Sequence, residues 1–246
     1  MTRFGLGVVL AALACGPMAH AQAPVPDLKA VETQVLERTN AYRRKNGLPP
    51  LTSNPQLTAA ARDFAAYMAR ASSFSHTADG REPADRLAAS GYGWCEYGEN
   101  LGLQEDSRGF TAQRLSGGFV DGWIGSPPHR KNMLAGNVTQ IGVGVARGPR
   151  EASRYIAVQE FGRPASMRVE FKIDNRSGRP VAYHYAGQRG EATPGGVISY
   201  TSCSADRLSF DTGGGQDYQP RDGQVYVLSP SPDGVRVEVQ SADAPR

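Results

Sequence analysis

The sequence predicts an α+β protein in which a layered α/β/α sandwich precedes a small all-β, sandwich-like domain. Two observations support this fold class. Apolar residues recur at helical spacing in the first half of the chain, whereas from Met167 onward short alternating runs are separated by turn clusters. Because the character of the sequence changes at Pro164, we place the first domain at 27–163 and the second at 166–241.

Helices are expected early in the first domain. Asp27 and Asn54 each precede a helical run and have the side chain of a typical N-cap. Two further helical runs cover 82–89 and 110–124, and Gly and Pro residues end the second of them. The segment 91–98 is rich in Gly and aromatic residues, so we expect it to be irregular.

Strands are expected after the helices. Residues 141–145 alternate Ile or Val with Gly, and residues 155–161 form a second alternating run. Glu160 lies in the second run, and we expect its side chain to face the solvent rather than a cavity. The second domain has alternating runs without any helical period, at 169–173, 181–185, 197–201, 224–228 and 235–239.

The first 21 residues have the pattern of a signal peptide. Arg3 supplies a positive charge, residues 4–14 are apolar, and residues 19–21 read Ala-His-Ala, a small-x-small cleavage site. The apolar run is too short to span a bilayer, and no later segment reaches a spanning length. We therefore expect an exported protein, periplasmic or extracellular, with no transmembrane segment.

The charge balance excludes one class of partner. The formal net charge is +3, with 27 basic and 24 acidic residues. No block of Lys or Arg stands out, so we expect no nucleic-acid partner, because such proteins carry a clustered basic surface.

Two cysteines remain after the predicted cleavage, Cys95 and Cys203. They fall in different predicted domains. In an oxidising compartment a disulfide persists, so we favour a bridge that joins the two domains. The alternatives are two separate thiols, or a Cys95 thiol that acts as a nucleophile.

Residues 31–162 contain a series of short motifs. In order they read Asn40-x-x-Arg43, Gly47-Leu48-Pro49-Pro50-Leu51, Asn54-Pro55-x-Leu57, Phe74-Ser75-His76, Asp79-Gly80, Asp85-Arg86, Gly91-Tyr92, Gly98-Glu99-Asn100, Trp123-x-x-Ser126-Pro127-x-His129-Arg130 and Thr139-x-Ile141-Gly142-Val143-Gly144. On these motifs the chain resembles the bacterial type of the CAP superfamily, also called the SCP or cysteine-rich secretory protein family. The resemblance covers about half of the chain and implies an α/β/α sandwich for it.

The resemblance also implies a central cavity that collects two histidines and two acidic residues. His76 matches the first histidine, and Glu99 matches the first acid. At the other two positions this chain has Ser126 and Asn137, so the family's set of four is incomplete. His129 offers a different second histidine, and the sequence leaves open whether it reaches the same cavity.

Metal chemistry is one interpretation of these residues. Two imidazoles and a carboxylate with an open position form a recognised catalytic zinc arrangement, which lowers the pKa of a bound water. His76 and His129 are therefore the candidate metal ligands, and Zn or another divalent cation is the cofactor that the resemblance allows. The residues come from separate loops and form no short-range metal motif, so their spacing gives no support.

Each candidate also has a structural interpretation. His76 could bond a loop carbonyl, Glu99 could pair with His76 or accept backbone N–H groups, and His129 could cap a short helix. Asn100 is expected to organise its loop through local backbone bonds. A serine mechanism at Ser126 has no identifiable acidic partner, so we do not favour it.

Two functions from different classes follow. The favoured one is a non-enzymatic binding module that presents a groove to a lipid, a cell-wall component or a protein ligand. The alternative is a metal-dependent hydrolase that uses the His/Glu cavity. A zinc site requires His76, Glu99 and His129 to converge at about 2.0–2.2 Å from one point. Lipid binding instead requires an apolar tunnel.

Overall fold

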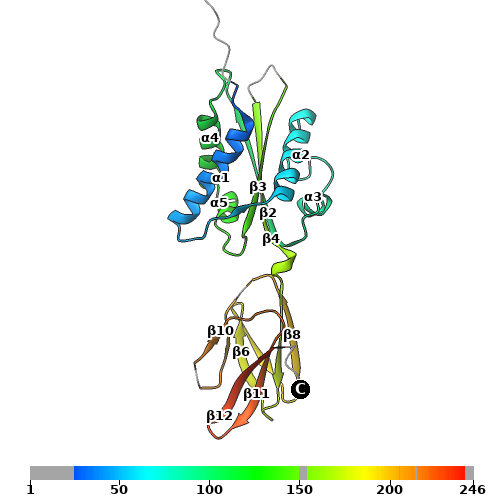
Figure 1. The fold of residues 1–246 in the computed structure, drawn as a ribbon, viewed down its shortest axis with the longest axis vertical. Helices are drawn as coiled ribbons and strands as arrows, with labels where there is room; N and C mark the ends of the chain where they lie inside the picture. The colour runs from blue at the N-terminus through cyan, green and yellow to red at the C-terminus, as the bar shows by residue number, and fades with distance from the viewer. Residues whose placement is uncertain (1–24, 150–153, 205, 214, 242–246) are drawn as a thin grey trace, which may run out of the picture.

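The computed structural model describes residues 25–149, 154–204, 206–213 and 215–241 (Figure 1). An α/β/α sandwich forms the N-terminal part, and strands alone form the C-terminal part, which confirms the predicted fold class. The domain boundaries at 27–163 and 166–241 stay a prediction, and the predicted signal peptide lies outside the described residues. Within the described ranges, no helix is long and apolar enough to cross a membrane.

A four-stranded sheet forms the middle layer of the sandwich. Its strands, in spatial order, are β1 (Thr52–Ser53), β3 (Gln140–Arg147), β4 (Arg154–Pro164) and β2 (Trp94–Glu105). β1 runs parallel to β3, and the other neighbours are antiparallel. β2 is therefore an edge strand, and its register places Glu99 directly across from Glu160 of β4.

Helices cover both faces of this sheet. One face carries α1 (Leu28–Lys45), α4 (Ala112–Gly125) and α5 (Pro127–Met133), and the other carries α2 (Pro55–Ala71) and α3 (Pro83–Ala89) (Figure 1). The predicted N-caps are confirmed, because the Asp27 side chain accepts from the N–H of Lys29 and the Asn54 side chain accepts from the N–H groups of Gln56 and Leu57.

The alternation of β3 explains how closely α2 approaches the sheet. Ile141 and its i+2 neighbours face α1, whereas the glycines between them face α2. A Cβ at Gly142 would lie 2.1 Å from the carbonyl carbon of Leu57, and one at Gly144 would lie 2.2 Å from the amide nitrogen of Arg62. The helix backbone therefore lies directly on these two glycines.

The C-terminal part consists of two sheets around an aromatic core, the first antiparallel and the second mixed. The first contains β10 (Asp217–Tyr218), β9 (Leu208–Phe210), β6 (Val181–Tyr185) and β7 (Gln188–Ala192). The second contains β12 (Gly234–Ser241), β11 (Gln224–Ser231), β5 (Val169–Asn175) and β8 (Val197–Ser202). All five predicted runs form strands. β7, β9 and β10 were not expected, because they are short or lack alternating apolar residues.

Two expectations about the sandwich are wrong, and one predicted helix is confirmed with a later start. The segment 91–98 was expected to be irregular, but β2 begins at Trp94. A register shift between Trp94 and Glu96 interrupts the start of the strand, and from Glu99 to Gly102 the odd positions face α2 and α3 while the even positions face α4 and α5. The strand therefore has no simple alternation of polar and apolar residues. α4 begins at Ala112, two residues later than expected, because Thr111 is its N-cap. Glu160 does not face the solvent, since its exposed fraction is 0%.

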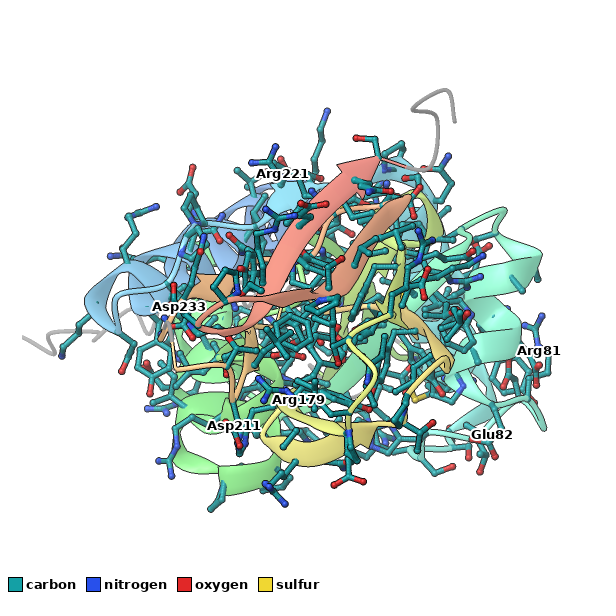
Figure 2. The ribbon with its side chains drawn as sticks, turned by 90° about the horizontal axis from the view of Figure 1, so that it is seen from below. Arg81, Glu82, Arg179, Asp211, Arg221 and Asp233 are labelled. Atoms are coloured by element: carbon teal, nitrogen blue, oxygen red, sulfur yellow. A yellow bond between two sulfur atoms is a disulfide. The ribbon has the colours of Figure 1, made fainter. Side chains whose placement is uncertain are left out.

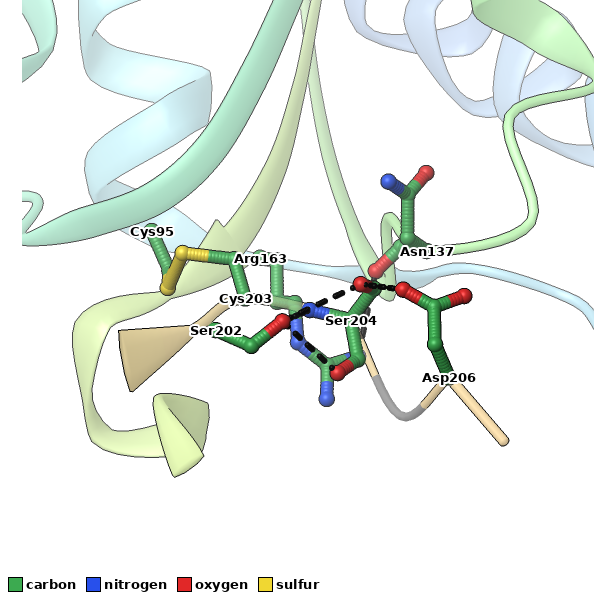
Figure 3. The surroundings of a disulfide bond; sticks show 7 residues. All are labelled: Cys95, Asn137, Arg163, Ser202, Cys203, Ser204 and Asp206. Carbon is green, nitrogen blue, oxygen red and sulfur yellow. Dashed lines mark hydrogen bonds between the residues drawn. A yellow bond between two sulfur atoms is a disulfide. The ribbon is translucent and has the colours of Figure 1, made fainter. Parts of the chain in front are cut away.

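Cys95 and Cys203 form a disulfide between β2 and the segment that follows β8 (Figure 3). The favoured prediction is confirmed, and the bridge joins the sandwich to the C-terminal strands. Polar groups surround it: Arg163 donates to the carbonyl of Asn137 at 3.2 Å. Burial raises the pKa of the neighbouring Glu96, although a hydrogen bond from Asn137 and the charge of Arg163 act against the rise.

Charged side chains lie around the outside of both parts. Figure 2, seen from the C-terminal end, shows Arg179, Asp211 and Arg221 on the strands and loops, and Arg81 with Glu82 beside α3. These labelled charges include both signs, which agrees with the absence of a clustered basic block in the sequence.

Candidate functional site

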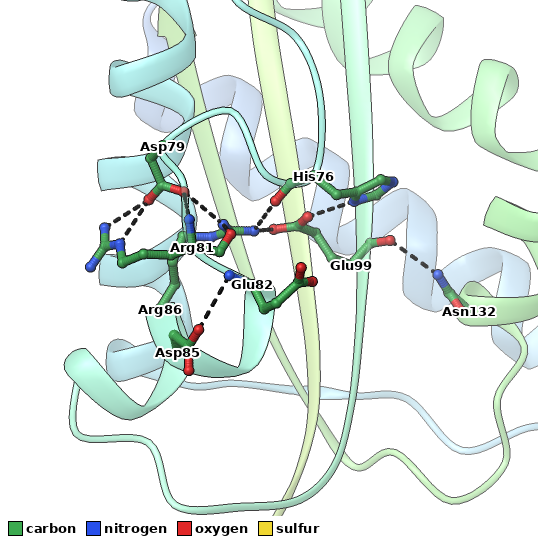
Figure 4. Close-up of polar contacts among 8 residues, drawn as sticks. All are labelled: His76, Asp79, Arg81, Glu82, Asp85, Arg86, Glu99 and Asn132. Atoms are coloured by element: carbon green, nitrogen blue, oxygen red, sulfur yellow. Dashed lines mark hydrogen bonds and ion pairs between the residues drawn. The ribbon is translucent and has the colours of Figure 1, made fainter.

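The Glu99 carboxylate is the centre of a charged cluster on the α2 side of the sheet (Figure 4). Its Oε1 lies 2.6 Å from Nδ1 of His76, and its Oε2 lies 2.6 Å from Nη2 of Arg86. Only 2% of the Glu99 side chain is exposed. Both of its oxygens therefore already have partners within the protein.

Arg86 ties this cluster to the loop that connects α2 and α3. Its guanidinium also donates to Oδ1 of Asp79, to the carbonyl of Arg81 and to the carbonyl of His76. It lies 3.5 Å from the centre of the Phe64 ring and is 2% exposed. The loop is thus held against α3 by one buried cation.

Asp79 is the second acid that Arg86 contacts. Burial would raise the pKa of its carboxyl, but hydrogen bonds from Arg81 and the charge of Arg86 outweigh burial and hold that pKa below its usual value. Asp79 is therefore a fixed carboxylate whose role is to anchor the loop, and it points away from His76 (Figure 4).

His76 connects the cluster to the surface, because 53% of its side chain is exposed. An ionised carboxylate can only accept a hydrogen bond, so the contact with Glu99 places the proton on Nδ1. Nε2 makes no hydrogen bond within the described residues and can contact a molecule from outside. A carboxylate on one ring nitrogen fixes both the tautomer and the ring orientation.

His129 lies on α5, on the other side of β2, yet it does approach His76. Burial lowers the pKa of His129, and the charge of His76 lowers it further. The two histidines are therefore close enough for the charge of one to act on the other. Neither is bonded to the other among the described residues, so they form a pair of neighbours rather than a hydrogen-bonded dyad.

Asn100 does not join the cluster. Its side chain is fully buried on the α1 side, where Nδ2 donates to the carbonyl of His129 and to Oε1 of Gln159, both at 3.1 Å. Its Oδ1 accepts from Nδ2 of Asn132 at 2.9 Å, and Gln159 continues to the hydroxyl of Thr39 at 2.8 Å. Asn100 is thus part of an internal amide network.

Ser126 and Asn137, which occupy the remaining positions implied by the resemblance, lie elsewhere. Ser126 is the residue between α4 and α5, and its backbone N–H donates to the carbonyl of Trp123. Asn137 belongs to the junction near the disulfide, where it contacts Glu96 and Arg163. The structure therefore brings together His76, Glu99 and His129 only.

Glu160 is the residue that sequence reasoning missed. It lies across from Glu99, and neither of its oxygens has a donor among the described residues. Burial first and the Glu99 carboxylate second raise the pKa of Glu160 well above its usual value, while Arg86 acts in the opposite direction. The available signal was the parity of the strand, because Glu160 shares the face of Val158, which faces α2.

The donor atoms do not fit a three-ligand zinc site. In the ranges that the structure describes, no group of three or more His, Cys, Asp or Glu residues could hold a metal ion. Glu99 has both oxygens engaged, and the Arg86 cation lies next to it. Two imidazoles remain, which is fewer than the three protein ligands of catalytic zinc sites.

The comparison with protein families now decides the classification. The model of the cysteine-rich secretory protein family, CAP, matches residues 36–161, which is about half of the chain. The chain belongs to the CAP family. Its matched region contains the sandwich except the start of α1 and the last three residues of β4, so the cluster around Glu99 lies within a CAP domain.

Three similar proteins come from bacteria. An uncharacterised protein of Bacillus subtilis, YkwD, is 34% identical over 118 residues, which are 48% of this chain and 43% of that protein. The chain therefore matches less than half the length of this relative. Among solved structures, an extracellular SCP-domain protein of Bacillus anthracis is 26% identical, with a TM-score of 0.46, over 55% of this chain and 41% of that one. An outer surface protein of Borrelia burgdorferi is 21% identical, with a TM-score of 0.48, over 56% and 96%.

Pockets of the CAP domain are polar or small. A pocket of about 90 Å³ lies beside Arg86, and one of about 370 Å³ lies between α1 and α4. Drug-sized ligands occupy roughly 300–1,000 Å³ of mostly apolar space. The larger pocket is lined by Gln34, Glu37, Arg38 and Gln113, so neither of the two is the apolar tunnel that lipid binding requires.

Proposed function

We propose that the CAP domain is a non-enzymatic binding module of an exported protein, and that His76 contacts its ligand. The observation that carries the proposal is the engagement of Glu99, whose two oxygens bond His76 and Arg86. This arrangement presents one oriented, half-exposed imidazole to the outside. The interdomain disulfide supports export, because such bonds persist in oxidising compartments.

Catalysis has less support from the same geometry. A general base must be free to take a proton from a positioned nucleophile or water. Glu99 is already bonded twice, and Ser126 makes no hydrogen bond to His76 or His129 among the described residues. A metal-assisted hydrolase would also need a third metal ligand. Catalysis would thus need a free general base or a third metal ligand, and the described residues supply neither. Binding needs neither group.

Aromatic side chains on the strand that carries Glu99 favour a polar envelope ligand. Tyr97 is 40% exposed and shares a strand face with Glu99, and the Trp94 ring meets it edge-on with centroids 4.6 Å apart. Aromatic rings beside hydrogen-bonding groups suit a sugar ring or a peptide side chain. Among the three ligand classes we therefore place a cell-wall component first, a protein second and a lipid last.

Cosedimentation tests this proposal. The mature chain would be mixed with purified peptidoglycan, and in parallel with anionic phospholipid vesicles, for wild type, His76→Ala and His184→Ala. His184 is a matched control, because its side chain is 49% exposed on β6 and lies 3.5 Å from Oδ1 of Asp211. We expect peptidoglycan binding in wild type and His184→Ala, and about tenfold weaker binding, or 1.4 kcal/mol, in His76→Ala.

Two outcomes would overturn the proposal. Equal binding by His76→Ala and wild type would show that His76 is not a contact residue. Calorimetry of the EDTA-stripped protein provides the second test: micromolar zinc affinity that His76→Ala abolishes would establish a metal site and favour the hydrolase. Binding to the vesicles alone would replace the cell-wall component with a lipid.

A further inference from the structure

Glu160 lies in an environment that disfavours an ionised carboxylate. It is fully buried, and its cross-strand partners are Glu99 on β2 and Gly142 on β3. Gly142 has no side chain, and the backbone of Leu57 in α2 covers it directly. Neither oxygen of Glu160 has a hydrogen-bond donor among the described residues. An ionised carboxylate there would lose its hydration without compensation.

The nearby charges offer no counter-ion for an ionised Glu160. Arg86, the cation that acts on it, already bonds Glu99 through Nη2 and Asp79 through Nη1. Arg81 is the other cation of the cluster, and it bonds Asp79. Ionised Glu160 would make three carboxylates that face two guanidinium groups. With a neutral Glu160, the two remaining carboxylates balance the two cations.

We propose that Glu160 is protonated and that its O–H donates a hydrogen bond to a carboxylate oxygen of Glu99, which makes Glu160 the residue that positions Glu99 against His76. Two carboxyl groups that share a site hold one proton between them, because both cannot be ionised. The cross-strand pairing of Glu99 and Glu160 places the two carboxyl groups on the same face of neighbouring strands, both toward α2. Glu99 is then held by three donors: the imidazole of His76, the guanidinium of Arg86 and the carboxylic acid of Glu160.

In this arrangement buried Glu160 has a positioning role, although it does not itself reach the ligand. The Glu99 carboxylate can fix the tautomer of His76 only if it stays in place, and the acid behind it prevents it from turning inward. The inference rests on the proposed function only where it takes His76 as the contact residue. The measurements below use no ligand, so their failure and the failure of the binding proposal are distinguishable.

Infrared spectroscopy tests the proton directly. Wild type and Glu160→Gln would be compared at neutral pH, with Glu191→Gln as the control, because Glu191 is exposed on β7. We expect the C=O stretch of a protonated carboxylic acid in wild type and in Glu191→Gln, and its loss in Glu160→Gln. If that band does not change in Glu160→Gln, Glu160 is ionised and the proposal is wrong.

The pH dependence of unfolding gives a second readout. A carboxyl whose pKa is raised in the folded state contributes stability that is fully present below its unfolded pKa, about 4.3, and that is lost as pH rises through the folded pKa. Glu160→Gln removes this dependence. We expect the unfolding equilibrium constant of wild type, relative to Glu160→Gln, to rise by up to about tenfold per pH unit above pH 4.3. A constant ratio would contradict the proposal.

The positioning role needs a readout that simple packing would not change. Glu160→Gln keeps an N–H donor toward Glu99, whereas Glu160→Leu has a similar size and no donor. Nitrogen-15 NMR of the His76 ring should show a single tautomer with Nδ1 protonated in wild type and Glu160→Gln. In Glu160→Leu we expect a mixture of tautomers. A wild-type tautomer ratio in Glu160→Leu would overturn the positioning role.

Discussion

Two separate polar networks lie on β2 and β4. Each strand contributes one of two adjacent residues to each network: Glu99 or Asn100 from β2, and Glu160 or Gln159 from β4. Asn100 and Gln159 face α1, where they join Thr39 in a chain of neutral hydrogen bonds. Glu99 and Glu160 face α2, where their partners are charged. The two networks lie back to back on the same pair of strands, because successive side chains of a strand point to opposite faces.

The two faces differ in whether their polar network reaches the surface. The neutral network is internal: every amide in it has partners, and it links β2 and β4 to α1 and α5. The charged cluster instead ends at the half-exposed ring of His76. Amide networks need only hydrogen bonds, whereas buried charges need counter-ions, so we expect the loss of one contact to cost more on the charged face.

The largest expected effect comes from breaking the charged face. Arg86→Met removes the cation that Glu99 and Asp79 share, and leaves two buried carboxylates without it. We expect a loss of about 3–5 kcal/mol in the free energy of unfolding, measured by denaturant titration. Arg81→Met is the control, because Arg81 bonds the same Asp79 but its side chain is 52% exposed.

That control should lose about 1 kcal/mol or less, since an exposed ion pair is weak. Similar losses in the two variants would mean that burial does not distinguish the two arginines. Loss of the buried arginine would then cost no more unfolding free energy than loss of an exposed one. This result would contradict the expected difference between the charged face and the neutral face.

A smaller effect is expected from the neutral face. Asn100→Ala removes the donors to Gln159 and to the carbonyl of His129, and removes the acceptor for Asn132. Neutral groups left unpaired in the interior cost about 1–3 kcal/mol, so the loss of unfolding free energy should be smaller than in Arg86→Met. If Asn100→Ala were the more damaging of the two, the neutral network would be the principal support of the sheet.

The smallest effect concerns pH and His129. Its pKa is lowered in the folded state by burial and by His76, so the stability it contributes is present above the unfolded pKa of about 6.5 and is lost as pH falls through the folded pKa. His129→Gln should therefore lose less stability than wild type between pH 7 and pH 5. Melting temperatures would be measured for both proteins between pH 7 and pH 5. If they fell equally in the two proteins, the pKa of His129 would not be lowered in the folded state.

Local signals in the sequence predicted much of the fold. Asp27 and Asn54 cap the helices that they were expected to begin, because capping depends on a side chain and the backbone two or three residues away. All five alternating runs of the C-terminal part form strands. The start of β2 was missed because a register shift interrupts it between Trp94 and Glu96 and its buried and exposed residues do not alternate regularly, so its pattern resembles an irregular segment.

Less of the candidate site could be predicted. His76, Glu99 and His129 were singled out from motifs, and the structure brings these three into one region. Arg86 stood in a motif without an assigned role, and Glu160 was expected to be exposed. Their roles depend on which helix covers which face of the sheet, and that is set by packing over long sequence distances.

By itself, the sequence determined the family, the order of the sandwich and the β-only part, the helix caps and the two cysteines available for a bridge. These properties depend on residue types and on neighbours close in the chain. Only the tertiary structure decided that Glu160 lies behind Glu99, and that Asn100 faces away from His76. Burial and the distance between charges arise only when α2 and α3 dock on the sheet, because both are properties of the packed molecule.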